Sequence, residues 1–246
     1  MLREVDETVW APPSAPWVMH QTWQNLLFAH WPVNPQQISP LLPSGLPLDT
    51  FGGMAWIGVV PFTMSDVAPR FVPGIPGLSQ FPEINVRTYV VRDGKPGVYF
   101  FSLDAGNAIA VSIARNIFHL PYFNAQFTVK SQKESIHYAS HRTHAHAGGG
   151  DFVGTYQPIG PVFRSEAGTL AHWLTERYCL YTTDRQQRLL RGEIRHRHWP
   201  LQPATAHITE QTLTEAAGIT LPTSDPILHF AQRLDVAIWW LAEVDR

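Results

Sequence analysis

Residues 83–103 read EINVRTYVVRDGKPGVYFFSL, and this stretch decides the fold class. Successive side chains of an extended strand point to opposite faces, so residues two apart share a face. One face carries Ile84, Val86, Thr88 and Val90, and the other carries Glu83, Asn85, Arg87 and Tyr89. Residues 92–97, RDGKPG, have the chemistry of a turn, and VYFFSL at 98–103 supplies a partner strand. The stretch therefore predicts an antiparallel hairpin.

Further strand-like runs recur on both sides of this hairpin. They lie at residues 54–62, 123–130, 136–142, 189–198 and 228–243. A helix is predicted over about residues 107–118, because Asn107 can cap it and isoleucines recur every fourth residue from Ile109. Pro121 stops that helix, and a second helix is expected from about residue 168 to residue 177. Many strands and few helices indicate a mainly β fold, a closed or nearly closed antiparallel barrel with a few short helices.

The composition is that of an ordinary folded domain. The chain has 246 residues, of which 44% are hydrophobic and 15% charged, and a chain of this length can bury a core without disulfides. We expect a single domain over residues 1–246, with an extended N-terminal segment at 1–16. A net charge of −2 leaves no basic excess, which argues against a nucleic-acid partner. No apolar run reaches the ~18 residues of a membrane span, so we expect no membrane partner.

Cysteine usage and the N-terminus bear on the compartment. The single cysteine, Cys179, excludes an internal disulfide and favours a reducing compartment. Residues 1–7, MLREVDE, are acidic and lack an apolar core, so they do not read as a secretory signal. These features predict a cytoplasmic protein. The oligomeric state stays open, and a homo-oligomer is compatible with the sequence.

Six longer motifs resemble one known family. They are WQNLLFAHWPV (23–33), AWIGVVPF (55–62), PEINVRTYV (82–90), GVYFFSLD (97–104), LPYFNA (120–125) and LTERY (174–178). Together they resemble the YqjF-like family of unknown function, over nearly the whole chain. That family is similar in fold to acetoacetate decarboxylase. The resemblance implies a β-barrel or cone with a buried pocket.

The resemblance to the decarboxylase does not extend to its imine-forming lysine. In that enzyme the lysine lies just after a Phe-Pro pair that follows a helix; here Tyr122 and Phe123 stand at the matching positions. The chain has only three lysines, Lys95, Lys130 and Lys133. An imine-forming lysine must be desolvated or placed beside another cation, so that it is neutral at working pH. Lys95 lies in a turn and the other two flank a strand end, so we expect no Schiff base.

Arg87 and Tyr89 are the first candidates for ligand binding. If their face lines the barrel interior, the opposite face packs against a helix or loop outside the barrel. Arg87 then needs a carboxylate partner, because an unpaired buried charge is costly and a guanidinium binds a carboxylate through two hydrogen bonds. In the alternative, this face points to water and the face with Ile84, Val86 and Val90 is the core, or Arg87 pairs structurally with an acid such as Glu83.

The end of the first predicted helix supplies further candidates. A spacing of four residues places Arg115 and His119 on one helix face. His119 can titrate near neutral pH and Tyr122 can donate to a developing oxyanion, so these two are the catalytic candidates, with Arg115 as a ligand-binding residue. In the alternative, the cations only cap the helix C-terminus.

Glu176 and Arg177, at the end of the second predicted helix, are candidates for supporting the pocket residues from behind. In the alternative, they form an ion pair that joins helix to barrel.

The histidines raise the question of a metal. His196 and His198 would share a face of a strand, and a second histidine-rich stretch contains His137, His141, His144 and His146. A metal site needs a third ligand and hydrogen-bond partners that hold the ligands in place, and no spacing in the sequence fixes either of these. We therefore expect no metal and no cofactor.

Three functions remain open at this point. The first is an enzyme that acts on a small organic acid without a lysine imine, with a lyase-like or hydrolase-like activity. The second is a binding protein that holds a small molecule in the same pocket without chemistry. The third is a structural barrel filled by its own side chains. An open cavity with titratable groups would favour the first of these functions.

Overall fold

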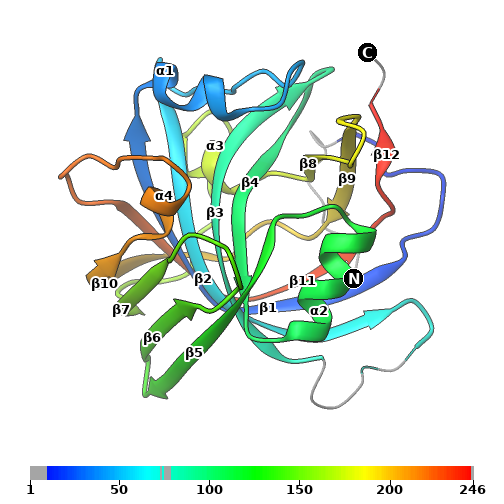
Figure 1. Ribbon diagram of the computed structural model, residues 1–246. Coiled ribbons are helices and arrows are strands. Elements are labelled where there is room, and N and C mark those ends of the chain that lie inside the picture. Colours follow the sequence, from blue (N-terminus) through cyan, green and yellow to red (C-terminus); the bar gives the residue numbers. More distant parts are fainter. Residues whose placement is uncertain (1–9, 73, 75–78, 245–246) are drawn as a thin grey trace.

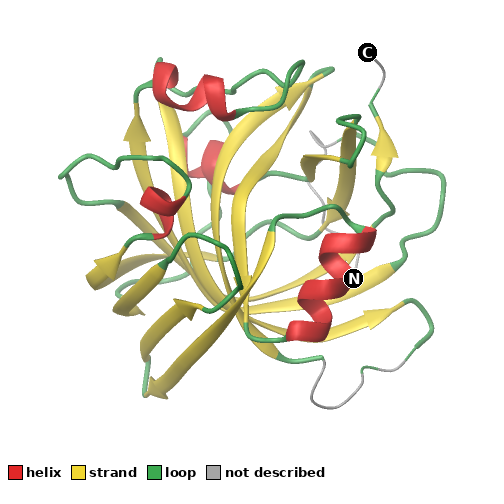
Figure 2. Cartoon of the chain, viewed as in Figure 1, coloured by secondary structure: helices red, strands yellow, loops and turns green. Residues whose placement is uncertain are grey.

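The computed structural model describes residues 10–72, 74 and 79–244, so most of the expected N-terminal segment lies outside the described residues. The strands are β1 (Met19–Val33), β2 (Ala55–Pro69), β3 (Phe81–Arg92), β4 (Lys95–Ala105), β5 (Tyr122–Gln132), β6 (Ser135–Arg142), β7 (Asp151–Pro158), β8 (Cys179–Thr183), β9 (Leu189–Arg195), β10 (Leu201–Gln211), β11 (Ile227–Ile238) and β12 (Ala242–Glu243). The helices are α1 (Pro35–Ile38), α2 (Ala108–Ile117), α3 (Leu170–Thr175) and α4 (Leu213–Ala216). The prediction of a mainly β barrel with short helices is confirmed (Figure 2).

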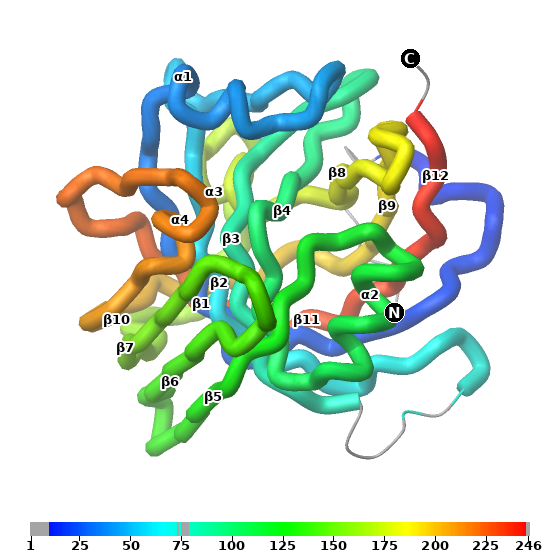
Figure 3. Tube along the Cα trace, viewed as in Figure 1, coloured from blue at the N-terminus to red at the C-terminus, as the bar shows by residue number. Residues whose placement is uncertain are grey.

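The strands close into two rings that share a central sheet of β11, β1, β2, β3 and β4 (Figure 1). On one side β5, β6, β7 and β10 complete a nine-stranded barrel, which the parallel pairing of β4 with β5 closes. On the other side β8 and β9 bridge β4 to β11. Figure 3 shows these two groups of strands on opposite sides of the central sheet. The central sheet therefore has a covered interior on both faces.

The predicted hairpin is present as β3 and β4, each longer than expected. Arg92 pairs with Lys95 across a turn in which Asp93 and Gly94 both have positive φ, 53° and 69°. This is the conformation that a two-residue hairpin with right-handed strand twist requires. The Tyr181 hydroxyl donates to the carbonyls of both Arg92 and Lys95 and so fixes the turn.

The apolar face of β3 does not lie outside the barrel, and that expectation is wrong. Ile84 and Val86 are fully buried in a core that fills the nine-stranded ring, together with Tyr138 of β6 and Phe152 of β7. Both faces of β3 are buried because the central sheet is enclosed by a ring on each side.

Helix α2 forms as predicted, but it ends at Ile117, several residues before the proline that was expected to stop it. The Asn107 side chain accepts hydrogen bonds from the backbone N–H groups of Ile109 and Ala110. The helix ends at Ile117, and His119 adopts a φ of 49° as the chain turns back toward the sheet. His119 therefore lies beyond the helix, so it does not share a helix face with Arg115.

Several strands were not predicted, or were predicted too long. No strand was expected for β1, β7, β8 or β10. Strand β1 is buried on both faces over much of its length and does not alternate, whereas β7 and β10 do alternate in burial. Strand β9 ends at Arg195, so His196 and His198 do not lie on a strand together. The predicted strand 228–243 is broken at residues 239–241. Within the described residues, no helix has the length and apolar character needed to cross a membrane.

Candidate functional site

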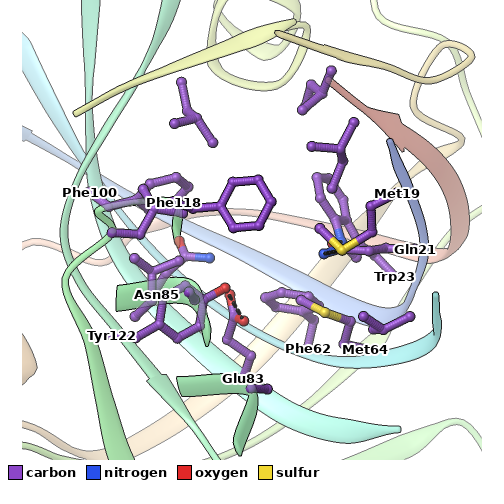
Figure 4. Close-up of a pocket in the computed structure, with 18 of the residues that line it drawn as sticks. Met19, Gln21, Trp23, Phe62, Met64, Glu83, Asn85, Phe100, Phe118 and Tyr122 are labelled. Carbon is purple, nitrogen blue, oxygen red and sulfur yellow. Dashed lines mark hydrogen bonds between the residues drawn. The ribbon is translucent and has the colours of Figure 1, made fainter. Parts of the chain in front are cut away.

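The ring formed by the central sheet, β8 and β9 surrounds a cavity of about 340 Å³, and residues of α2 also line it. Figure 4 shows part of its lining. Its walls are mainly apolar. The residues that contribute apolar surface include Met19, Trp23, Val60, Phe62, Met64, Phe81, Phe100, Leu103, Ile109, Ile113 and Phe118. The polar face of β3 contributes a stripe of polar groups to this interior, namely Glu83, Asn85 and Arg87. The cavity thus lies on the opposite side of the central sheet from the filled core.

Arg87 is a cation without a protein counter-ion in the part of the chain that the structure describes. Its Nε is buried and has no hydrogen-bond partner, and no described carboxylate forms an ion pair with it. Its guanidinium lies 5.3 Å from the centre of the Phe28 ring and 5.8 Å from that of Tyr89. Aromatic faces attract a cation but do not satisfy its N–H donors. The guanidinium therefore keeps donors available for a ligand that enters the cavity.

Gly58 makes room for this arrangement. It pairs with Arg87 across β2 and β3. A Cβ at Gly58 would lie 3.1 Å from the His30 ring and 3.4 Å from the Arg87 Cγ. A side chain at this position would therefore press mainly on the His30 ring, which would have to shift by a few tenths of an ångström, while Arg87 Cγ would be near ordinary contact distance.

Glu83 and Tyr122 form a buried hydrogen-bonded pair at another part of the cavity wall (Figure 4). The Tyr122 hydroxyl donates to Glu83 Oε2 over 2.8 Å, and Glu83 is only 2% exposed. Burial raises the pKa of the Glu83 carboxyl to about 8. Burial also raises the pKa of Tyr122, and the adjacent carboxyl adds to this shift. At neutral pH the pair therefore holds two protons, and Glu83 can give one to a bound molecule.

Asn85 lies beside this pair, and its buried Oδ1 atom has no hydrogen-bond partner among the described residues. The position of Asn85 between Glu83 and Arg87 makes it a third polar contact along the same strand.

His196 presents a ring nitrogen without a partner to the same interior. Its Nδ1 lies 2.7 Å from the Arg197 carbonyl, which can only accept, so the ring proton is on Nδ1. The ring stacks on Tyr178 with 4.5 Å between centres. Burial lowers the pKa of His196, against the opposing effect of Glu176, so the ring is neutral. Its Nε2 is buried and makes no hydrogen bond to another described residue, although the Arg177 backbone carbonyl acts on the ring and raises its pKa. In the described part of the chain, no group of three or more His, Cys, Asp or Glu residues is arranged to hold a metal ion.

Glu176 and Arg177 are both buried but do different things. Arg177 lines the cavity, and its Nη1 donates to Asp49 Oδ2 over 2.7 Å. Glu176 lies behind the wall, where it accepts hydrogen bonds from the Tyr178 hydroxyl at 2.6 Å and the Trp199 backbone N–H at 3.0 Å. It thereby holds Tyr178, on which His196 stacks.

The remaining sequence candidates lie outside the cavity. Tyr89 is fully buried behind Arg87, and its hydroxyl is 2.6 Å from His30 Nε2. Arg115 is exposed and donates to the Tyr122 carbonyl over 2.6 Å. The His119 carbonyl accepts from the Thr182 hydroxyl, and neither His119 nor Arg115 is among the residues that line the cavity. The structure therefore brings Arg87 and Tyr122 to the cavity and leaves the other three behind or outside it.

Glu83 and His196 are the residues that the sequence reasoning missed as members of this cavity. The sequence could have indicated Glu83, because it shares a strand face with Arg87. His196 carried none, because its position depends on the chain leaving β9 at Arg195.

The three lysines are distant from these groups. Lys95 donates to Glu193 Oε1 over 2.7 Å, while Lys130 and Lys133 are exposed on β5 and the turn after it. None of the three is among the residues that line the cavity.

Comparisons with known proteins agree with this architecture. Residues 20–235 match the DUF2071 family, described as an uncharacterized conserved protein. The chain is 48% identical over 227 residues to the uncharacterized protein YqjF of Bacillus subtilis, covering 92% of this chain and 93% of the relative. Among solved structures, it is similar to the enduracididine biosynthesis enzyme MppR complexed with pyruvate, with a TM-score of 0.65, 14% identity and coverage of 98% and 93% of the two chains. It is also similar to acetoacetate decarboxylase from Legionella pneumophila, with a TM-score of 0.60, 12% identity and coverage of 97% and 93%. At these identities the two solved structures establish the fold alone.

Proposed function

The chain belongs to the DUF2071 family of uncharacterised conserved proteins, and from its cavity we propose that it binds a small organic acid and transfers a proton to or from it. The acid bears a carboxylate and a second oxygen function, such as a carbonyl. No lysine imine takes part.

One observation carries this proposal: several residues that line the cavity each have a buried polar atom with no hydrogen-bond partner among the described residues. Buried donors and acceptors are nearly always hydrogen-bonded in folded proteins, so such a cluster needs an explanation. Five residues that line the cavity each have one such atom, namely Asn85 Oδ1, Arg87 Nε, Arg177 Nη2, His196 Nε2 and Trp199 Nε1. A ligand rich in oxygen supplies partners for the donors in this set.

The chemistry of the groups assigns a role to each wall. The Arg87 guanidinium binds the carboxylate, because it forms no ion pair with any described residue and a guanidinium binds a carboxylate through two hydrogen bonds. The protonated Glu83 carboxyl, held by Tyr122, donates to the second oxygen function. The neutral His196 ring accepts a proton at Nε2. The pyruvate in the MppR structure supports an oxo acid as ligand, since the two proteins share a fold.

A ligand screen tests this proposal. Purified protein should show a rise in melting temperature with oxo acids and other carboxylates, and not with matched amides or alcohols. Native mass spectrometry of the untreated protein should detect any retained acid. A protein indifferent to every carboxylate would favour the structural alternative and contradict the proposal.

Proton transfer distinguishes an enzyme from a binding protein. In deuterated water, NMR should show exchange of the hydrogens adjacent to the carbonyl of a bound oxo acid, and Glu83→Gln should abolish this exchange. Binding without exchange would support the second candidate, a non-catalytic carrier, which the mainly apolar wall favours.

A trapping experiment tests the absence of an imine. Borohydride treatment in the presence of acetoacetate or a diketone should leave the mass of the protein unchanged, because Lys95 is ion-paired and Lys130 and Lys133 are exposed. A bona fide acetoacetate decarboxylase treated in parallel is the positive control. A stable adduct mapped to any of the three lysines would contradict the prediction.

A further inference from the structure

We infer that the ligand is an amphipathic acid, whose carboxylate binds Arg87 and whose apolar body lies against helix α2. This inference rests on the proposed function and narrows its substrate class. An amphipathic ligand of this kind is larger and more apolar than a compact oxo acid such as pyruvate.

The size of the cavity is the first argument. About 340 Å³ falls in the range of pockets that hold drug-sized ligands, roughly 300–1,000 Å³. A compact acid such as pyruvate would leave most of the apolar wall without contacts, and unfilled apolar space forfeits dispersion contacts. The aromatic rings of Trp23, Phe62, Phe100 and Phe118 line the cavity, and they suit a bulky apolar body.

The distribution of polarity is the second argument. On the sheet side of the cavity the polar residues lie along β3, where the four steps from Glu83 to Arg87 span about 13 Å at the usual rise of a strand. Helix α2 contributes the apolar side chains of Ile109 and Ile113, and Phe118 follows directly after it. A molecule that satisfies both walls has an oxygen-bearing edge and an apolar body.

The exposure of α2 is the third argument. Ile109 and Ile113 line the cavity and yet are 55% and 48% exposed, so the cavity reaches the surface between them and the end of β2, where Val67 and Pro69 also line it. Ligand pockets close most of a bound molecule off from water. An apolar body at this opening would cover isoleucine surface that water otherwise contacts.

A series of straight-chain acids tests the inference. The dissociation constants of acetate, butanoate, hexanoate and octanoate are measured by calorimetry on the full chain, with 3-phenylpropanoate as an aromatic probe. Each added methylene should tighten binding by about fourfold until the body reaches the opening at α2. Pyruvate should bind more weakly than octanoate.

Two matched variants locate the apolar body. Ile113→Glu should weaken octanoate at least about tenfold, because it places a charge in the apolar wall, and leave butanoate nearly unchanged. Ile117→Glu is the control, since Ile117 lies one turn further along α2, is 49% exposed and is not among the residues that line the cavity. Ile113→Ala serves if the charged variant does not fold.

The outcomes are distinguishable. Binding that depends on Arg87 but not on chain length would overturn the inference and leave the proposed function standing. An equal loss in Ile117→Glu and Ile113→Glu would also overturn it, because the effect would not come from the cavity wall. No carboxylate binding at all would overturn the proposed function itself.

Discussion

Replacing Arg87 with methionine is expected to abolish carboxylate binding. Methionine keeps an unbranched apolar side chain of similar reach but removes every donor. Removing one member of a buried charge pair costs about 2–5 kcal/mol in binding, which corresponds to a loss of roughly 30-fold to several thousand-fold. Calorimetric titration of the tightest acid from the screen, on the wild type and on Arg87→Met, measures this loss.

The same substitution should not destabilise the protein in the absence of a ligand, although it abolishes carboxylate binding. In the wild type the buried Arg87 Nε has no partner in the part of the chain that the structure describes, and a buried unpaired polar group lowers stability. Arg87→Met should therefore unfold at the same denaturant concentration as the wild type or at a higher one. Arg185→Met is the matched control, because Arg185 is exposed and bonds only to Asn116 on the surface. Unchanged acid binding in Arg87→Met, or equal losses in both variants, would remove Arg87 from the site.

The alternation of side chains along β3 explains which part of the cavity could be predicted from the sequence. Residues two apart share a face, so grouping Arg87 with Glu83 and Asn85 followed from the sequence alone. The alternation could not show that the other face is buried as well. That requires knowing that β5 to β7 and β10 fold back over Ile84 and Val86, which is a contact between distant segments.

The residues around α2 show why the rest of the site was harder to predict. A helix that continued to Pro121 would have kept Arg115 and His119 on one face. Instead the helix ends at Ile117, and His119 has a positive φ that turns the chain away from the helix axis. The His119 carbonyl then accepts a hydrogen bond from the Thr182 hydroxyl. Tyr122 reaches the cavity because β5 begins there, parallel to β4, and a single sequence does not reveal this long-range pairing.

The free energy of unfolding is expected to fall with rising pH because of Glu83. The pKa of this carboxyl is about 8 in the folded protein against a usual value of 4.5, so between these values the folded state holds one proton more than the unfolded state. The contribution of Glu83 to stability is therefore largest below pH 4.5, decreases by about 1.4 kcal/mol per pH unit through this window, and is constant above pH 8. Urea unfolding curves at intervals of about one unit from about pH 5 to about pH 9 measure this slope, because that range covers most of the interval between the usual pKa of Glu83 and its raised value.

Glu83→Gln should remove this slope and keep the fold. Glutamine is neutral at every pH, and its carbonyl oxygen can still accept the hydrogen bond from Tyr122. The variant should therefore match the wild type in free energy of unfolding at low pH. Near pH 8 it should be more stable than the wild type by several kcal/mol, the order of magnitude that the raised pKa of Glu83 implies. Glu134→Gln, at an exposed position in the turn before β6, should leave the wild-type slope unchanged. Parallel curves for the wild type and Glu83→Gln would mean that Glu83 is ionised at neutral pH, and would remove it as the proton donor of the cavity.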